Sequence, residues 1–248
     1  MPASAASLAA LRARIAHLEG GAQARAVLPF GIPMLDRRLP QGGLAVGCLH
    51  EVAGGGSAAV DGAAAAGFAA GIAARLPGQV LWCVTRADLF APGLALAGLP
   101  PDRVIHVEAG DETSVLACME EGLRHGGLAA VVAEVGRLPM TASRRLHLAA
   151  KASGTTGLVL RRWRRQADAA DFGQPTAAMT RWRISELPSA PLPVPGLGRA
   201  RWLVELIRAR AGESVDLELE ACDGTGHLGL PADVADRPAA AGGRHAYG

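Results

Sequence analysis

The stretch FGIPMLDRRLPQGGLAVGCLHEVAGGGSAAVDG, residues 30–62, decides the fold. Within it, residues 46–52 form an apolar, β-rich run with glycines on both sides. Three consecutive glycines, Gly54, Gly55 and Gly56, follow this run, and a long segment rich in Ala and Gly comes after them. A strand, a glycine loop and a helix in this order present backbone N–H groups at a helix N-terminus, where phosphate groups bind. The stretch therefore predicts a phosphate loop between a strand and a helix.

The rest of the chain alternates short β-rich runs with helical segments. Further buried strands are predicted at residues 79–85, 103–108, 128–134 and 157–161, and helices at 57–75, 89–97, 113–125 and 141–153. This alternation predicts an α/β fold with a mostly parallel, twisted sheet and helices on both faces. Three later runs, at residues 180–187, 202–210 and 215–221, alternate apolar with charged residues. We expect them to be half-exposed antiparallel strands at the C-terminal edge of the sheet.

Composition narrows the class of protein. A chain of 248 residues is long enough to bury a sizeable core. The four cysteines are spaced singly along the chain, which argues against a zinc site and against a disulfide framework. No segment has the pattern of a signal peptide or of a membrane span. We expect a cytoplasmic protein without a metal, a cofactor or a membrane partner.

The residues around the glycine loop resemble the lead-in to the ATP loop of the RecA family. The matching positions are Gly31, Leu35, Asp36, Leu39, Gly42, Gly43, Leu44, Gly47, Glu51, Val52 and Gly54. The resemblance implies a RecA-like P-loop core over residues 26–190, completed by C-terminal strands within residues 191–235.

The loop departs from the family at the positions that grip ATP. Counting on from Gly54, a working loop would have Gly, Lys and Ser or Thr at Ala59, Val60 and Asp61. Val60 brings no charge to a phosphate, and Asp61 brings a charge of the same sign. Two like charges about 4 Å apart repel by roughly 1 kcal/mol in water and by about 4 kcal/mol at an effective dielectric constant of 20. Since Lys151 is the only lysine in the chain, we expect no ATP hydrolysis and no catalytic residues.

Two other catalytic positions of the family are also altered. Where the resemblance places the glutamate that activates water, this chain has Arg86. The Walker B acid falls on Glu134, which is isolated, whereas metal-assisted hydrolysis needs several groups together. The alternative for Glu134 is a structural ion pair with a nearby arginine such as Arg137.

Residues 137–183 carry a large excess of positive charge. Ten basic residues stand against two acidic ones, so the segment has a charge of +8 and the rest of the chain −6. In the RecA family the DNA-contacting loops correspond to residues 136–141 and 163–179 of this chain. Arginines beside an aromatic ring suit single-stranded DNA. The candidate DNA-binding residues are Arg144, Arg145, Arg161, Arg162, Trp163, Arg164 and Arg165. Alternatively, Trp163 packs in the core and the arginines form an ordinary solvated surface.

The two ends of the chain differ in pattern. Leu8, Leu11, Ile15 and Leu18 repeat at helical spacing, which predicts an amphipathic helix within residues 1–25. A helix this short is marginal alone, so it docks either on its own core or on another chain, including a second copy. Residues 236–248 lack apolar periodicity, and we expect them to be disordered.

Together with the altered loop, the stretch VPGLGRARWLVELIRARAGESVDLEL, residues 194–219, resembles the ImuA family of RecA-like proteins. The resemblance covers about residues 3–235. It implies a non-catalytic accessory factor of SOS-induced, mutagenic translesion DNA synthesis. The implied partners are an ImuB-like Y-family polymerase homologue and an error-prone replicative-type polymerase, with RecA and single-stranded DNA as further candidates.

Two other functions remain open at this stage. The first is an active RecA-type ATPase with an unconventional loop, which nucleotide-dependent thermal stabilisation would reveal. The second is a SulA-like inhibitor of cell division, which overexpression would reveal by cell filamentation.

Overall fold

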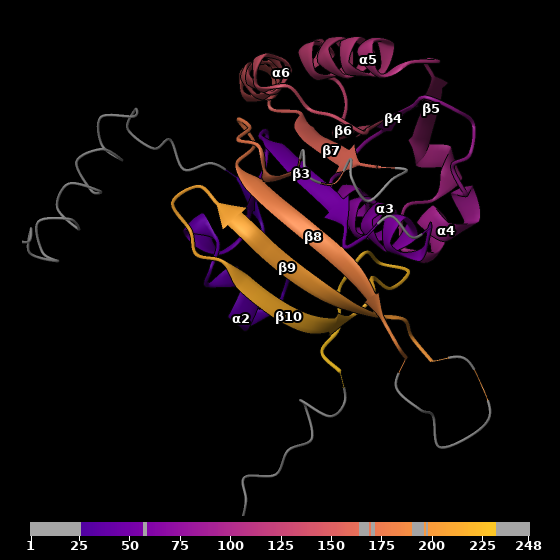
Figure 1. Ribbon diagram of the computed structural model, residues 1–248, viewed down its shortest axis with the longest axis vertical. Helices are drawn as coiled ribbons and strands as arrows, with labels where there is room; N and C mark the ends of the chain where they lie inside the picture. Colours follow the sequence, from indigo (N-terminus) through magenta and orange to yellow (C-terminus); the bar gives the residue numbers. More distant parts are fainter. Residues whose placement is uncertain are drawn as a thin grey trace, which may run out of the picture.

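The computed structural model describes residues 26–56, 59–163, 169, 172–189, 196 and 198–231. The expected N-terminal helix with Leu8, Leu11, Ile15 and Leu18, and the expected disordered tail, lie outside these residues. In the described part of the chain, an eight-stranded sheet has the order β10-β9-β8-β3-β7-β6-β4-β5 (Figure 1). Its strands are β3 (Leu49–Gly54), β4 (Val80–Val84), β5 (Val104–Glu108), β6 (Ala130–Val135), β7 (Thr156–Arg161), β8 (Thr180–Leu187), β9 (Arg201–Ala209) and β10 (Val215–Glu220).

Each pair of neighbours from β8 through β3, β7, β6 and β4 to β5 is parallel, whereas the pairs β8–β9 and β9–β10 are antiparallel. The prediction of an α/β fold with a mostly parallel sheet is confirmed. The expectation that residues 180–187 are purely antiparallel was wrong, because β8 is parallel to β3 on one side and antiparallel only to β9 on the other. Trp182 and Ile184 of β8 are fully buried, as suits a strand inside the sheet rather than at its edge.

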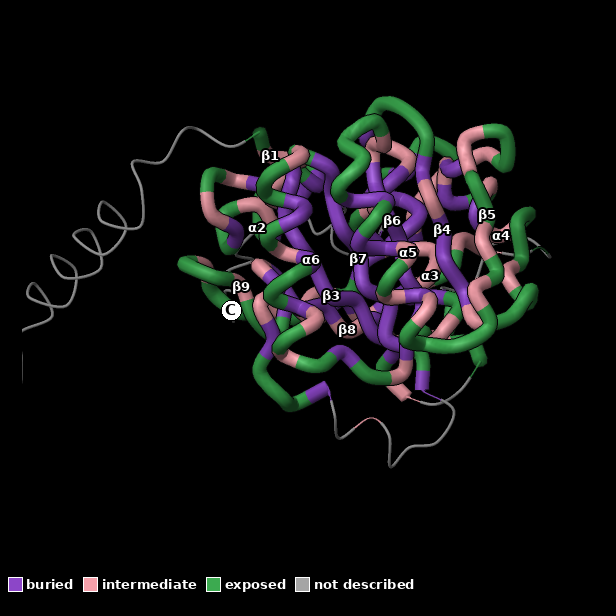
Figure 2. The backbone as a smooth tube through the Cα atoms, turned by 90° about the horizontal axis from the view of Figure 1, so that it is seen from above, coloured by how far each residue is buried: buried purple, intermediate pink, exposed green. Residues whose placement is uncertain are grey.

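Helices cover both faces of the sheet (Figure 1). The helices are α2 (Pro33–Asp36), α3 (Ala59–Ala74), α4 (Ala91–Leu96), α5 (Glu112–His125) and α6 (Met140–Ser153), with 3-10 turns at Pro40–Gly42 and Pro101–Arg103. Helix α3 packs on β3 and β8, while α5 packs on β4 and β6 on the opposite face. Figure 2 shows the buried strands β3, β4 and β7 enclosed by exposed loops and helix surfaces. The apolar strand runs were recognisable from sequence because both of their faces are covered.

A cluster of aromatic rings fills the core on the α3 face. The ring centroids of Phe30 and Phe68 are 5.8 Å apart, and each lies 5.3 Å from the Trp182 ring. Phe30 follows the short strand β1 (Val27–Leu28), which pairs with β2 (Leu44–Ala45). This two-stranded ribbon was not predicted, because two residues per strand are too few to show a period of two.

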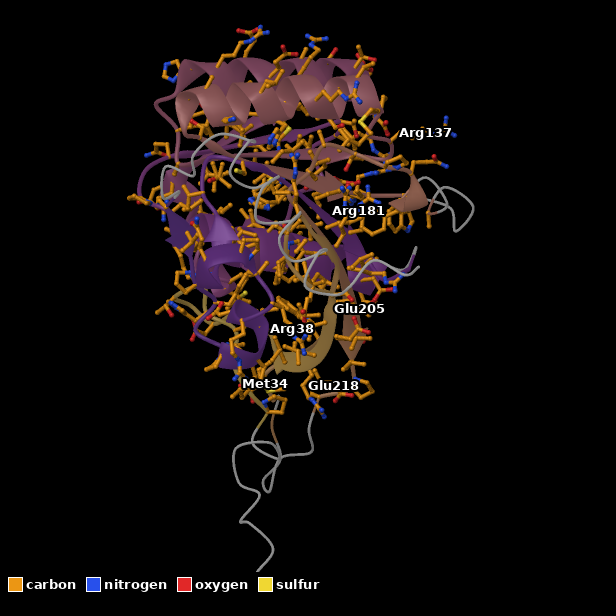
Figure 3. The ribbon with its side chains drawn as sticks, turned by 90° about the vertical axis from the view of Figure 1, so that its left-hand side faces the viewer. Met34, Arg38, Arg137, Arg181, Glu205 and Glu218 are labelled. Carbon is orange, nitrogen blue, oxygen red and sulfur yellow. The ribbon has the colours of Figure 1, made fainter. Side chains whose placement is uncertain are left out.

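The C-terminal strands have an exposed charged side. Arg183 on β8 donates to Glu205 on β9 (Nε to Oε2, 2.7 Å), and Arg201 on β9 donates to Glu218 on β10 (Nη2 to Oε2, 2.7 Å). Glu205 and Glu218 lie along this part of the sheet in Figure 3. Such cross-strand pairs stabilise a half-exposed sheet and discourage further strands from adding to its edge.

Local signals fix the ends of the two helices on the other face. Asp111 caps α5 by accepting the backbone N–H groups of Thr113 (2.9 Å) and Ser114 (3.0 Å). Helices α5 and α6 both end at glycines in the left-handed conformation, Gly126 (φ 74°) and Gly154 (φ 80°). Within the described residues, no helix combines the length and the hydropathy needed to cross a membrane.

Candidate functional site

A cleft of about 1000 Å³ lies over the carboxyl ends of β3, β4, β6 and β7. Parallel α/β sheets bind their ligands at this edge. One side of the cleft is mainly apolar and comes from α3, α4 and the segment before α4; it includes Ala59, Ala63, Ala66, Phe90 and Leu94. The other side carries charges from the strand ends, namely Arg86, Asp88, Glu134, Arg137 and Arg162. The predicted phosphate loop therefore does border a ligand-sized cleft.

The glycines of the loop are required by close packing. A Cβ atom on Gly54 would lie 2.9 Å from the backbone carbon of Asp61, and one on Gly55 would lie 1.9 Å from Ser185 Oγ. Gly55 also donates its N–H to the carbonyl of Ile184 on β8 (2.8 Å). The loop is thus held against α3 and β8 by contacts within the chain. Of the candidate loop residues, Gly54 and Gly56 line the cleft.

The first turn of α3 presents no cation to the cleft. The Val60 side chain is 56% exposed, and the Asp61 carboxylate accepts the backbone N–H of Glu186 (3.1 Å), which ties α3 to the end of β8. Lys151 is in the last turn of α6. Because α6 runs from the carboxyl edge of the sheet back to its amino edge, Lys151 lies far from the loop and cannot substitute for the missing lysine.

Glu134, at the end of β6, is only 5% exposed and has two partners. Its Oε1 accepts from Trp82 Nε1 (2.8 Å), and its Oε2 accepts from Arg162 Nη1 (2.8 Å). Glu134 therefore forms the expected ion pair with a nearby arginine, but this arginine is Arg162 and not Arg137, the example named from sequence. Arg162 follows β7, the neighbour of β6, and its backbone N–H donates to the Val135 carbonyl (2.9 Å), which places it beside Glu134.

Arg162 also joins Asp88 to this network. Its guanidinium donates to both carboxylate oxygens of Asp88, at 2.8 and 3.0 Å. Burial acts against the Asp88 carboxylate, but the hydrogen bond and charge of Arg162, with a contribution from Arg86, outweigh it and lower the pKa of Asp88. Burial likewise opposes the charge on Arg162, but its bonds to Asp88 and Glu134 outweigh burial and raise the pKa of Arg162.

Glu112, a cleft residue that sequence reasoning missed, shapes the loop between β6 and α6. Its carboxylate accepts the backbone N–H groups of Gly136 (2.8 Å) and Arg137 (3.2 Å). With this bond, each carboxylate on the cleft wall has a donor from the protein itself. Arg86 and Arg137, by contrast, form no ion pair within the described part of the chain.

A second network of charges adjoins the cleft, and its side chains are almost fully sealed from solvent. The Glu51 carboxylate on β3 accepts from Arg161 Nη1 on β7 (2.6 Å), Arg181 Nε on β8 (2.9 Å) and Thr176 Oγ1 (2.9 Å). Arg161 donates further to the Gly136 carbonyl, at 3.2 Å from Nε and 2.6 Å from Nη2. The guanidinium groups fill their remaining hydrogen bonds with backbone oxygens, as buried charges require.

The sealed network holds the loop that precedes β8. Arg181 donates to the carbonyls of Phe172 and Gln174, both at 2.7 Å. Its guanidinium also lies 5.1 Å from the centre of the Phe172 ring. Figure 3 shows Arg137 at the outer limit of the side chains and Arg181 inside the body of the domain.

The DNA-binding candidates separate into three groups. Arg161 is buried and Arg162 is paired with Asp88 and Glu134, so neither offers a free guanidinium to DNA. Trp163 is also buried and packs on Phe172 with ring centroids 5.6 Å apart, which corrects the expectation that bases stack on it. Arg144 and Arg145 are exposed on α6. Arg164 and Arg165 lie outside the described residues.

No cluster of three or more metal-ligating side chains occurs in the described ranges. Cys83 is buried near the end of β4, where burial raises the pKa of its thiol to about 12.

Comparison with known proteins gives the family. No family model matches the chain. The chain is 42% identical over 229 residues to Protein ImuA of Caulobacter vibrioides, in both strain NA1000/CB15N and strain CB 15. The match covers 87% of this chain and 93% of each relative. At this identity and coverage, the chain belongs to the ImuA family.

Proposed function

We propose that this protein is a non-catalytic, RecA-like accessory factor of damage-induced, mutagenic translesion DNA synthesis. Its membership of the ImuA family and the RecA-like lead-in to the glycine loop support this role. The proposed partners are an ImuB-like Y-family polymerase homologue and an error-prone replicative-type polymerase, with RecA as a further candidate. The protein would act in the cytoplasm by holding other proteins together rather than by turning over a substrate.

The observation that carries the proposal is the chemistry at the start of α3. By the RecA resemblance, Val60 replaces the phosphate-binding lysine and Asp61 replaces the magnesium-binding hydroxyl. Val60 is exposed, and Asp61 accepts the backbone N–H of Glu186 on β8. Glu134, in the Walker B position, is already bound to Trp82 and Arg162. Coordination of magnesium by Glu134 would require breaking its bonds to Trp82 and Arg162.

Contact with single-stranded DNA is a second part of the proposal. Arg137 and Arg144 are exposed on and after the loop between β6 and α6, and neither is ion-paired within the residues that the structure describes. Arg164 and Arg165 remain candidates by sequence. If this side binds DNA, affinity should fall with salt, with a log–log slope of about −0.7 for each phosphate contacted.

Nucleotide titration tests the central claim. If ATP bound with a Kd of about 10 µM, then about 1 mM ATP with magnesium would stabilise the fold by about 2.7 kcal/mol. We expect no change in the thermal unfolding midpoint of the full chain. The matched control restores the family pattern with Ala59→Gly, Val60→Lys and Asp61→Ser. Stabilisation of the unaltered chain by ATP would contradict the proposal and favour an active ATPase.

A genetic experiment tests the cellular role. Deleting the gene in its host should lower the mutation frequency after ultraviolet irradiation, and the full chain supplied in trans should restore it. A Val60→Ala chain should restore it equally, because the loop performs no phosphate chemistry. An unchanged mutation frequency in the deletion strain would refute the role.

A further inference from the structure

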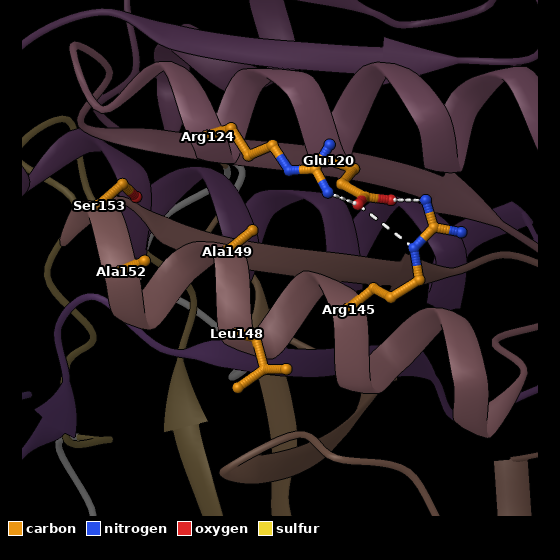
Figure 4. Close-up of a pocket in the computed structure, with 7 residues that line it drawn as sticks. All are labelled: Glu120, Arg124, Arg145, Leu148, Ala149, Ala152 and Ser153. Atoms are coloured by element: carbon orange, nitrogen blue, oxygen red, sulfur yellow. Dashed lines mark hydrogen bonds and ion pairs between the residues drawn. The ribbon is translucent and has the colours of Figure 1, made fainter.

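A hollow of about 360 Å³ lies between α5 and α6 (Figure 4). Its lining residues are Glu120, Arg124, Arg145, Leu148, Ala149, Ala152 and Ser153. None of them lines the cleft at the strand ends, so this is a separate feature of the surface.

One carboxylate is shared by arginines from both helices at one end of the hollow. The Glu120 side chain, on α5, is nearly buried and accepts from Arg124 Nη2 of the same helix (2.5 Å). Arg145, on α6, donates to the same carboxylate through Nε (3.3 Å) and Nη2. Figure 4 shows the two guanidinium groups approaching Glu120 from opposite sides. Arg124 also donates through Nη1 to Glu121 (3.1 Å). Both arginine side chains are more than half exposed, and each guanidinium has more N–H groups than these bonds use.

The other end of the hollow is apolar and made of small residues. Leu148 is 65% exposed, and Ala149 and Ala152 line the hollow with it. Leu146, two positions earlier, is buried in the core, so Leu148 is not needed to attach α6 to the sheet.

The surrounding surface is positively charged. Arg144 and Lys151 flank Leu148 at helical spacing, are exposed, and make no ion pair within the described ranges. With Arg124 and Arg145 they give four cations around the hollow, against the two carboxylates of Glu120 and Glu121. An apolar hollow with a cationic rim is complementary to an apolar side chain flanked by carboxylates.

We propose that the α5–α6 hollow docks a segment of a partner protein in which one large apolar residue is flanked by acidic residues. The apolar residue packs on Leu148, Ala149 and Ala152, and the acidic residues bind the outward donors of Arg124 and Arg145. Nucleic acid fits less well, because no aromatic side chain lines the hollow for base stacking. This inference rests on the partner-binding part of the proposed function.

Peptide selection tests the surface directly. The full chain is immobilised and a phage library of random 12-residue peptides is selected on it; the most enriched peptide is then labelled with fluorescein and measured by anisotropy. We expect enriched sequences with a single Leu, Ile or Phe among Asp and Glu. Leu148→Asp should weaken binding at least about tenfold, because it places a charge against the apolar anchor.

The matched control is Leu96→Asp on α4, since Leu96 is 75% exposed and lines neither the hollow nor the cleft. It should leave the affinity within about twofold, and both variants should keep the thermal unfolding midpoint of the unaltered chain. Arg145→Glu should also weaken binding, with a smaller loss in high salt.

Several results would overturn the inference: no enriched sequence, an enriched sequence without acidic residues, or equal loss from the Leu148 and Leu96 variants. Displacement of the labelled peptide by a dT20 oligonucleotide in an Arg145-dependent manner would assign the hollow to nucleic acid instead. If no peptide binds but deletion of the gene lowers the mutation frequency, only the proposed docking surface is refuted. If a peptide binds but deletion leaves the mutation frequency unchanged, only the proposed cellular role is refuted.

Discussion

Arg161 and Arg162 are consecutive residues at the end of β7, and they belong to two different networks of charge. Arg161 turns inward to Glu51 and has a fully buried side chain, whereas Arg162 turns to Asp88 and Glu134 and is 44% exposed. Successive side chains of a strand point to opposite faces, so one residue step separates a sealed network from an open one. Of two adjacent arginines, Arg161 therefore belongs to the sealed network and Arg162 lines the cleft. The local sequence does not distinguish these two roles.

Removing Glu51 should have the largest effect. Glu51→Gln leaves the guanidinium groups of Arg161 and Arg181 buried without a counter-charge, which we expect to cost about 3–5 kcal/mol of unfolding free energy. Urea unfolding of the full chain measures this loss of unfolding free energy. Glu218→Gln removes a carboxylate that is 58% exposed and pairs with Arg201; it serves as the control and should cost less than about 1 kcal/mol. A loss below about 1 kcal/mol for Glu51→Gln would mean that the buried Arg161 and Arg181 do not depend on Glu51 as their counter-charge.

His50, the buried residue before Glu51 on β3, should make the stability of the protein depend on pH. Its Nε2–H donates to the Ala45 carbonyl (2.8 Å) and its Nδ1 accepts from Thr180 Oγ1 (2.7 Å), so the neutral ring is the bound form. Burial lowers the pKa of His50 to about 4 from 6.5. The unfolded chain binds the extra proton first, so stability should decline as pH falls from about 6.5 to about 4, by roughly 3 kcal/mol in total.

Chemical unfolding at a series of pH values checks this decline. His50→Gln should be less stable near neutral pH but should show a flatter dependence between about pH 6.5 and pH 4, because glutamine does not titrate. Parallel pH curves for the two proteins would show that His50 does not govern the acid response.

Arg162→Ala probes the open network and should have a smaller effect. It leaves the Glu134 carboxylate with Trp82 as its remaining partner, but solvent in the cleft can reach the space vacated by the arginine. We expect a loss of about 1–3 kcal/mol, measured by urea unfolding. Arg137→Ala, which lines the same cleft without an ion pair to Glu134, should change stability by less than about 0.5 kcal/mol. Equal losses of stability from the two variants would support Arg137, the partner suggested by sequence, as an ion-pair partner of Glu134.

Sequence periodicity predicted the strands and helices that lie in the core. The runs at 128–134 and 157–161 became β6 and β7 within two residues, because strands buried on both faces show continuous apolar character. The direction of β8 was missed, since alternation in TRWRISEL reports the two faces of a strand but not the orientation of its neighbours. Whether a strand is parallel or antiparallel to its neighbour depends on the edge of the sheet at which the preceding loop ends.

The site was only partly predictable for a similar reason. The position of the loop and the acid at the end of β6 came from spacing along the chain, whereas the partner of Glu134 depended on the register between β6 and β7. Burial of Trp163 followed from Phe172, nine residues away, which no local pattern connects to it. A usable signal for the sealed network was present: a glutamate inside the apolar run VGCLHEV needs buried cationic partners, and arginines were abundant.

The clamp that Arg181 places on the carbonyls of Phe172 and Gln174 has a consequence for control. In nucleotide-driven switches a loop becomes ordered only while the terminal phosphate is present, and it relaxes on hydrolysis. Here a side chain of the protein itself, Arg181, binds the carbonyls of the loop before β8. On the proposed non-catalytic role, the amount of the protein in the cell, and not a cycle of nucleotide hydrolysis, would set its activity.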